Sequence, residues 1–436
     1  MKNSRLFISE FESEKRLRSS SSFSLPSLSL FKKRNDLLLH GMDGLTISMA
    51  EKGDILVTRI PLKDVYLHWW KETFCEVGNI SPNSSPSDDN ETSIYHLLQK
   101  DEATHEILKN SIIRNYAVTK EYYDMCNSIG MAVTEPDLAI VTMLNRKSWS
   151  NELRNRLGYA PRGITVSSVE AFDACIHKML DTYGNVLVKD SMGVSGRGIL
   201  PVDSHKAAER LSLHFRKQKE EGKQIFDFVI EPYLNCTMDF SCQLHIDRDG
   251  STIIDGYQKN TGIGFGYYSS EILRRDETDL ILSSGYPACV MNIGEEMAKT
   301  GYFGYACIDS MITDGDTVIP LLEINPRMSM GRFNLLLHQK TGKNCRLSYL
   351  EGTASGHGSV GKMLEDLERI RILYTKDHPY GVIPLAPNTW DTAKCSATDR
   401  IRVYYAIAYE KEGDYEKLLD SWLEYCAWNI CSGTIR

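Results

Sequence analysis

Two apolar stretches decide the fold: GYACIDSM at Gly304–Met311 and LLEINPR at Leu321–Arg327. Short continuous apolar runs of this kind are typical of buried strands, and the TDGD sequence between them is typical of a turn. We therefore predict two paired antiparallel strands over residues 305–312 and 318–325. The polar residues inside these apolar runs are then the first candidates for a functional site.

Three oxygen-bearing side chains on these strands form a candidate metal site. Glu323 and Asn325 are two residues apart, so both lie on one face of a strand. A two-residue turn at Asp314-Gly315 would pair Asp309 with Pro320, whereas a longer loop would bring Asp309 opposite Glu323. In that register two carboxylates and one amide oxygen converge, and these are ligands that Mg²⁺ prefers. The alternative is two solvent-facing acids beside a strand-ending Asn-Pro turn.

A glycine-rich turn follows another predicted strand in VLVKDSMGVSGRGI, Val186–Ile199. The strand ends at Lys189, and the apolar pattern resumes after the turn, so the loop is expected to join two strands. Small residues allow backbone N–H groups to approach phosphate oxygens, and lysine supplies a positive charge. The spacing matches neither a Walker A motif nor a dinucleotide fingerprint. An ordinary β-turn is the alternative. The small residues of the turn are Ser191, Gly193, Ser195, Gly196 and Gly198.

A third pattern is FVIEPYLNCTMDFS at Phe228–Ser241, where an apolar strand runs into Glu231 and a proline. Proline stops ladder pairing, so backbone groups freed at this break could bind the edge of a planar base. Asp239 lies eight residues further on, where a carboxylate could hold a ribose. The alternative is an edge strand that leaves a sheet.

The order and spacing of these motifs over residues 144–333 resemble the ATP-grasp superfamily of carboxylate–amine ligases. The resemblance implies a mixed α/β and α+β fold, the ATP-grasp fold, with ATP and Mg²⁺ or Mn²⁺ as cofactors. It implies that Lys147 and Lys189 lie near the phosphates and that Ser191–Gly198 is a mobile flap over them. The residues implied to hold adenine and ribose are Glu231, Tyr233, Leu234, Asp239 and Leu322.

The resemblance also implies catalytic roles. Asp309, Glu323 and Asn325 match the magnesium ligands, and Arg327 matches the basic residue that faces the reacting carboxylate. In D-alanine–D-alanine ligases an arginine precedes the first ligand by two residues, but this chain has Cys307 there. Lys259 or Arg327 would take over that role, and the sequence leaves the choice open. The EINPR form looks more like amino-acid and peptide ligases that carry a pre-ATP-grasp domain.

The rest of the chain divides by composition and pattern. Residues 1–44 are Ser-rich and basic and are predicted to be a flexible tail. A small α/β pre-ATP-grasp domain is predicted over residues 45–145, ending in a buried strand at Leu138–Leu144. The ATP-grasp core would then span 146–345, and a mixed α+β segment would complete the chain over 346–436. Within that core, residues 146–229 would carry the phosphate loop, and 230–345 would carry the hinge and the metal site.

Composition narrows the class of protein. The chain has 436 residues, of which 42% are hydrophobic and 25% are charged, which excludes general disorder. The net charge of −8 argues against a dominant nucleic-acid-binding surface, and no apolar run is long enough to span a membrane. The eleven cysteines form no C-x-x-C pair, which favours reduced thiols in a cytoplasmic protein.

The expected activity is therefore ATP-dependent joining of a carboxylate to an amine through an acyl phosphate, with ADP and phosphate released. Amino acids or peptides are the expected substrates, with no nucleic acid or membrane partner, and a homodimer is left open. Two alternatives remain. One is an ATP-grasp enzyme with a different acceptor, of the carboxylase or purine type. The other is a nucleotide-binding module that has lost catalysis.

Overall fold

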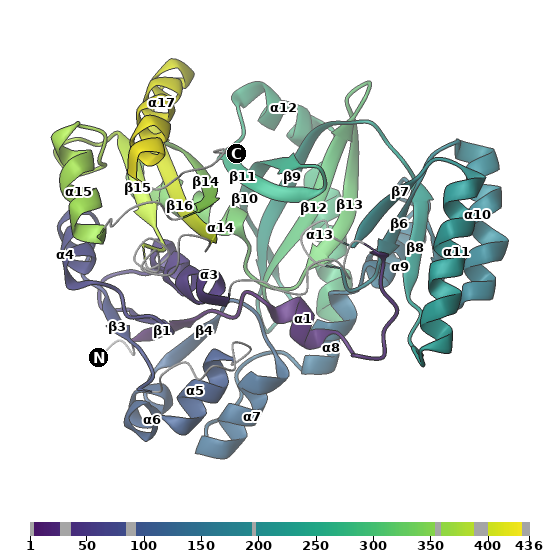
Figure 1. The fold of residues 1–436 in the computed structure, drawn as a ribbon, viewed down its shortest axis with the longest axis horizontal. Coiled ribbons are helices and arrows are strands. Elements are labelled where there is room, and N and C mark those ends of the chain that lie inside the picture. The colour runs from purple at the N-terminus through teal and green to yellow at the C-terminus, as the bar shows by residue number, and fades with distance from the viewer. Residues whose placement is uncertain are drawn as a thin grey trace.

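The structure is a computed structural model, and it describes residues 4–26, 36–83, 93–193, 198–353, 359–387 and 400–429. Ser195 and Gly196 of the predicted flap lie outside the described residues. The described chain forms one parallel and two antiparallel sheets, arranged side by side in Figure 1. The mixed α/β and α+β fold class is confirmed.

The N-terminal sheet is parallel, with strand order β3-β2-β1-β4. Two consecutive helices of this domain are separated by the single residue Asp101. The Asp101 carboxylate accepts a hydrogen bond from the backbone N–H of Asn83 (3.0 Å). The elements are β1 (Arg5–Ile8), α3 (Asp36–Gly41), the 3₁₀ helix η1 (Met42–Met49), β2 (Ile55–Val57), α4 (Asp64–Thr73), β3 (Gly78–Ile80), α5 (Ile94–Lys100), α6 (Glu102–Lys109), β4 (Ile112–Asn115) and α7 (Lys120–Ile129).

The prediction of a flexible tail is wrong for the described part of residues 1–44. Strand β1 lies inside the N-terminal sheet and pairs with both β2 and β4. Its residues alternate between two cores, because Leu6 and Ile8 pack on one face and Phe7 packs on the other. The apolar run of β1 is only three residues long. The strands that pair with β1 lie about 50 and 110 residues further along the chain. The local sequence pattern therefore could not show that these residues form a strand.

The predicted first ATP-grasp subdomain contains an antiparallel sheet with order β5-β8-β6-β7. Two helices pack on it, and their Phe172 and Phe215 rings meet at 5.2 Å in a separate hydrophobic core. In Figure 1 this subdomain lies at the right. Its elements are β5 (Ile164–Val166), α10 (Val169–Tyr183), β6 (Val186–Asp190), β7 (Ile199–Val202), α11 (His205–Glu220) and β8 (Phe228–Pro232).

The central sheet is antiparallel, with order β13-β12-β9-β10-β11-β14-β16-β15. The predicted C-terminal segment is not separate, because β14 pairs with β11 and carries β16 and β15 into the same sheet. The strands are β9 (Cys236–Ile246), β10 (Thr252–Ile263), β11 (Gly266–Ile272), β12 (Gly304–Thr313), β13 (Thr317–Asn325), β14 (Asn344–Thr353), β15 (Gly381–Leu385) and β16 (Arg400–Tyr409).

Helices cover the two faces of the central sheet. Helix α13 packs Tyr286 on Phe240 of β9, whereas α14 contacts the opposite face, where Asn334 donates to Gln258 (2.7 Å). The helices are α12 (Arg275–Ser283), α13 (Tyr286–Lys299), α14 (Met330–Thr341), α15 (Val360–Arg369) and α17 (Glu412–Asn429). The face of α14 is the one that carries the candidate site.

The predicted strand at Leu138–Leu144 is wrong, because these residues form helix α8. The Asp137 carboxylate accepts from the backbone N–H of Ala139 (2.7 Å) and caps the helix, and only Val141 and Leu144 are buried. A short apolar run does not separate a buried strand from one face of a short helix. Helix α8 leads directly into α9 (Lys147–Leu157).

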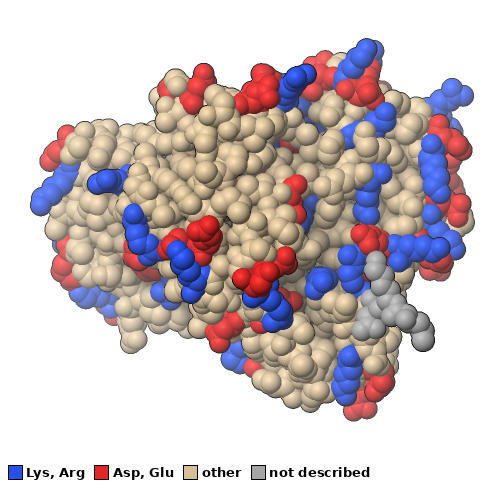
Figure 2. Space-filling view, turned by 180° about the vertical axis from the view of Figure 1, so that it is seen from behind, with Lys and Arg blue, Asp and Glu red and all other residues tan. Residues whose placement is uncertain are grey.

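Charged side chains of both signs are intermixed on the face shown in Figure 2. Within the described residues, no helix combines the length and the apolar character needed to cross a membrane.

Candidate functional site

Asp309 and Glu323 lie directly opposite each other on β12 and β13. The register shifts between Met311 and Asp309, where the single residue Ser310 faces three residues that begin with Pro320. Proline has no N–H to give to a ladder and is tolerated at such irregularities. The Ser310 hydroxyl bonds the Pro320 carbonyl (3.0 Å). The facing register is therefore produced by a three-residue loop at 314–316 together with this bulge.

The two carboxylates lie close enough for their negative charges to repel each other. Asn325 faces Cys307 two pairs further along, on the same face of the sheet, and its Nδ2 donates to Asp309 Oδ2 (2.8 Å). Burial, and then repulsion from Glu323, raise the pKa of Asp309 to about 7. A carboxyl pair in this state is a natural binding site for a cation.

Lys147 connects this pair to the glycine-rich loop. Its Nζ lies 2.8 Å from Glu323 Oε1 and 2.8 Å from the carbonyl oxygen of Gly193. Lys147 begins helix α9, and its backbone N–H donates to the Ser191 carbonyl (3.0 Å). The residues that flank the loop therefore hold the start of the helix that presents this lysine.

The residues present fit a hard divalent cation. Two opposed carboxylates and an amide are oxygen donors of the kind that Mg²⁺ takes. Within the described ranges, no group of three or more His, Cys, Asp or Glu side chains is arranged to hold a metal ion. A magnesium ion bound to the two carboxylates would therefore take its remaining ligands from Asn325 and from substrate oxygens.

The base of the glycine-rich loop is tightly packed. A Cβ on Gly193 would lie 2.4 Å from the Cα of Gly198, so these two positions require glycine. Asp190 lies at the end of β6, is almost fully buried, and receives both Nη atoms of Arg18 at 2.9 Å. Burial nevertheless raises the pKa of Asp190 above its usual value, against the effect of Arg18.

Lys189 and Glu231 contact each other. The Lys189 ammonium forms a buried ion pair with Glu231, which also receives Arg154 Nη2 (2.7 Å). Burial acts to raise the pKa of Glu231, but Lys189 and Arg154 outweigh it and leave the pKa lowered. Lys189 therefore carries its own counter-ion before any phosphate is present.

The predicted hinge connects the two antiparallel sheets, since β8 belongs to one and β9 to the other. Tyr233 is exposed and Leu234 is half-buried in that connection. Asp239 is exposed on β9 and accepts a hydrogen bond from the Cys236 thiol (3.3 Å). Leu322 is half-buried beside the candidate metal site.

Lys259 does not belong to this group. It pairs in register with Phe240, on the sheet face covered by α12 and α13, and its Nζ bonds Glu277 of α12 (2.8 Å). Asp309 pairs with Ser241, the next residue on β9, and therefore faces the opposite side. The prediction of a catalytic Lys259 is wrong, and Arg327 alone remains next to the metal set.

Lys259→Met is expected to change kcat and KM by less than about threefold and to cost at most about 1 kcal/mol of stability. The reason is that Glu277 keeps Arg274 as a second partner (3.0 Å). Steady-state kinetics and thermal melts check this prediction, with Lys206→Met on the exposed surface of α11 as the matched control. A tenfold loss of kcat in Lys259→Met would mean that Lys259 does take part in catalysis.

Several polar residues at the site escaped the sequence argument. Gln243 is fully buried on the site face, accepts from the Ser329 hydroxyl (2.7 Å) and contacts the Cys307 thiol (3.4 Å). The alternation of Asp239, Ser241 and Gln243 with apolar neighbours was a usable signal for it. Glu14, Arg18 and Tyr116 carried no such signal, because they reach the site only through the tertiary structure.

One curated relative shares sequence with the chain. It is the [butirosin acyl-carrier protein]–L-glutamate ligase of Niallia circulans, which is 23% identical over 261 residues. The match covers 57% of this chain and 58% of that protein, so the chain spans under two thirds of its length. No protein-family model matches the sequence.

Solved structures match far more of the chain. The N5-carboxyaminoimidazole synthetase of Staphylococcus aureus, complexed with ADP, has a TM-score of 0.51 at 12% identity, covering 97% of each chain. The biotin carboxylase domain of the Hydrogenobacter thermophilus 2-oxoglutarate carboxylase, a dimer with magnesium ADP and bicarbonate, has a TM-score of 0.53 at 12% identity. That match covers 93% of this chain and 90% of the other. The chain therefore shares the fold of these two ADP-bound enzymes.

Proposed function

We propose that the chain is an ATP-dependent ligase that activates a carboxylate as an acyl phosphate and joins it to an amine. The observation that carries this proposal is the position of Lys147, whose ammonium contacts both the glycine-rich loop and the carboxylate pair. A single cation between these two elements is where a triphosphate would need its negative charge offset. The curated ligase relative supports the same class of reaction.

The chemistry needs activation because a carboxylate is a poor electrophile. Its oxygen attacks the γ-phosphorus of ATP and ADP leaves. The amine nitrogen then attacks the acyl carbon, phosphate leaves, and the nitrogen loses a proton. Mg²⁺ held by Asp309, Glu323 and Asn325 would supply charge neutralisation on the phosphates. The protein's part is to position the reactants and to exclude water, which would hydrolyse the acyl phosphate.

The substrate classes that we propose are amino acids or peptides. The curated relative is named for L-glutamate and an acyl-carrier protein, so the amine or thiol of a carrier-bound acceptor belongs in the same assay. A homodimer and Mn²⁺ as a substitute metal remain part of the proposal.

The test measures ADP release from ATP and Mg²⁺ while single amino acids, dipeptides, amines and a loaded carrier protein are added in turn. We expect release to depend on one carboxylate and one acceptor, and mass spectrometry to find a product lighter than their sum by one water. Hydroxylamine replaces the acceptor as a control, because it traps an acyl phosphate as the hydroxamate.

Two outcomes contradict the ligase. Bicarbonate as the sole stimulant of ADP release would indicate a carboxylase-type reaction. Nucleotide binding with no turnover under any of these conditions would indicate a module without catalysis.

A further inference from the structure

The chain between β1 and residue 25 touches all three parts that surround the site. We call residues 10–25 the N-terminal strap. It includes the short helix α1 (Ser13–Leu17) and runs in Figure 1 from the N-terminal sheet across to the first ATP-grasp subdomain. Phe23 and Leu25 are buried in that subdomain's hydrophobic core.

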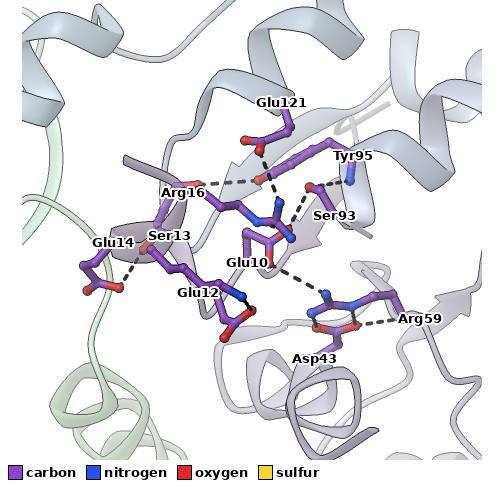
Figure 3. A network of polar contacts seen from close by, with 12 residues as sticks. Glu10, Glu12, Ser13, Glu14, Arg16, Asp43, Arg59, Ser93, Tyr95 and Glu121 are labelled. Atoms are coloured by element: carbon purple, nitrogen blue, oxygen red, sulfur yellow. Dashed lines mark hydrogen bonds and ion pairs between the residues drawn. The ribbon is translucent and has the colours of Figure 1, made fainter. Parts of the chain in front are cut away.

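The first end of the strap is fixed by a buried polar network, shown in Figure 3. Glu10 accepts from the Ser93 hydroxyl (2.8 Å) and pairs with Arg16 of the strap (3.3 Å) and with Arg59 (3.7 Å). Arg59 in turn makes a two-point pair with fully buried Asp43 (2.7 and 2.9 Å). The strap is therefore held to the N-terminal domain before it reaches the site.

In the middle of the strap, Glu14 meets the arginine of the EINPR motif. Its Oε1 lies 2.6 Å from Nε and 2.5 Å from Nη2 of Arg327. The Glu14 side chain is only 8% exposed, and the Ser13 hydroxyl donates to its other oxygen (3.2 Å). This is a buried, charge-assisted contact made by a segment 313 residues away in the sequence.

Arg327 makes four hydrogen bonds and one further ion-pair contact in this arrangement. Nε donates to Glu14, Nη2 forms the ion-pair contact with Glu14, and Nη1 donates to the Tyr116 hydroxyl (3.1 Å) and to the Met328 carbonyl (3.0 Å). Nη2 also donates to Asn325 Oδ1 (3.1 Å), while Asn325 Nδ2 donates to Asp309. A continuous chain of hydrogen bonds thus runs from Glu14 through Arg327 and Asn325 to Asp309.

Building on the ligase function proposed above, we propose that Glu14 is a positioning residue that holds Arg327 in the orientation that turns Asn325 toward Asp309. The hydrogen bond from Arg327 occupies one lone pair of Asn325 Oδ1. The second lone pair of this amide oxygen stays available for a metal ion. Every guanidinium nitrogen of Arg327 already donates to an acceptor of the protein itself. Its role toward the substrate is therefore that of a fixed positive charge rather than a clamp on a substrate carboxylate.

In the opposite role, the Glu14 carboxylate would compete with the substrate for Arg327 and would have to move away before the substrate binds. The anchors oppose this, because Ile8 on one side and Phe23 and Leu25 on the other are buried in different cores. Removing Glu14 would also leave the Arg327 charge without its counter-ion, which is costly for a buried pair. The strap is built as a permanent part of the site.

The direct test uses Glu14→Ala and a small carboxylate as a substitute. In thermal melts without substrates, sodium acetate is titrated against sodium chloride at equal ionic strength. Acetate is expected to raise the Tm of Glu14→Ala by several degrees with saturation, because binding to the folded state stabilises it. Wild type, and Glu14→Ala combined with Arg327→Met, are expected to show no such shift. Absence of an acetate-dependent shift in Glu14→Ala overturns the proposal.

Kinetics separate positioning from competition. Glu14→Ala is expected to lose about tenfold or more in kcat with less than a threefold change in KM for ATP, and acetate is expected to restore part of kcat. A rise in kcat/KM for the acid substrate would instead mean that Glu14 competes with it. If Glu14→Ala does not fold, Glu14→Gln serves, with an intermediate loss of kcat and no acetate response.

The two hypotheses fail separately. Inactive wild-type protein would remove the ligase function, whereas the substrate-free melts would still decide whether Glu14 holds Arg327.

Discussion

Glu323→Gln is expected to lower kcat about a thousandfold or more while the protein stays folded. The substitution keeps the shape of the side chain but removes one of the two opposed carboxylate charges and the ionic partner of Lys147. Both the proposed magnesium site and the link from Lys147 to the strand would be lost. ADP release with saturating substrates measures the effect, and Glu295→Gln on the exposed surface of α13 is the matched control.

Thermal melts of the same variant separate loss of chemistry from loss of fold. The pKa of Asp309 is raised from 3.8 to about 7, so the wild-type protein loses stability as pH rises through that window. Replacing Glu323 by an amide removes part of the repulsion that causes this loss. Thermal melts at pH 4, 6 and 8 are expected to show a smaller decline in Glu323→Gln. Near-normal turnover in this variant would contradict the site assignment.

Leu6→Ala is expected to destabilise the protein by about 2–5 kcal/mol. Leu6 is fully buried on β1, in the interior of the N-terminal sheet and against the core that continues beneath the central sheet. Urea unfolding followed by circular dichroism measures the change. Leu213→Ala is the matched control, because that leucine is 63% exposed on α11 and its truncation should cost no more than about 0.5 kcal/mol.

The outcome for Leu6 tests the largest disagreement between sequence and structure. A Ser-rich, basic start is typical of a tail, and a tail would tolerate the truncation. If Leu6→Ala unfolds at the same urea concentration as wild type, the first strand does not belong to the sheet, and the N-terminal strap loses its anchor.

The elements with strong local patterns were predictable. The strands at β12 and β13 lie where their apolar runs placed them. Helix α8 was not predictable, because seven apolar-rich residues satisfy either period and the Asp137 cap is a weak local signal. The face of Lys259 also required the structure, since it depends on the register between β9 and β10.

The sequence by itself indicated the fold class through its resemblance to a known family. It also indicated the residues that meet at β12 and β13, because strand alternation and turn chemistry are local. Only the tertiary structure decided how Asp309 comes to face Glu323, through the bulge at Pro320. It also decided that Glu14 and Arg18 reach Arg327 and Asp190. Those contacts join residues far apart in the chain, and the burial that makes them strong exists only after three separate sheets have packed around them.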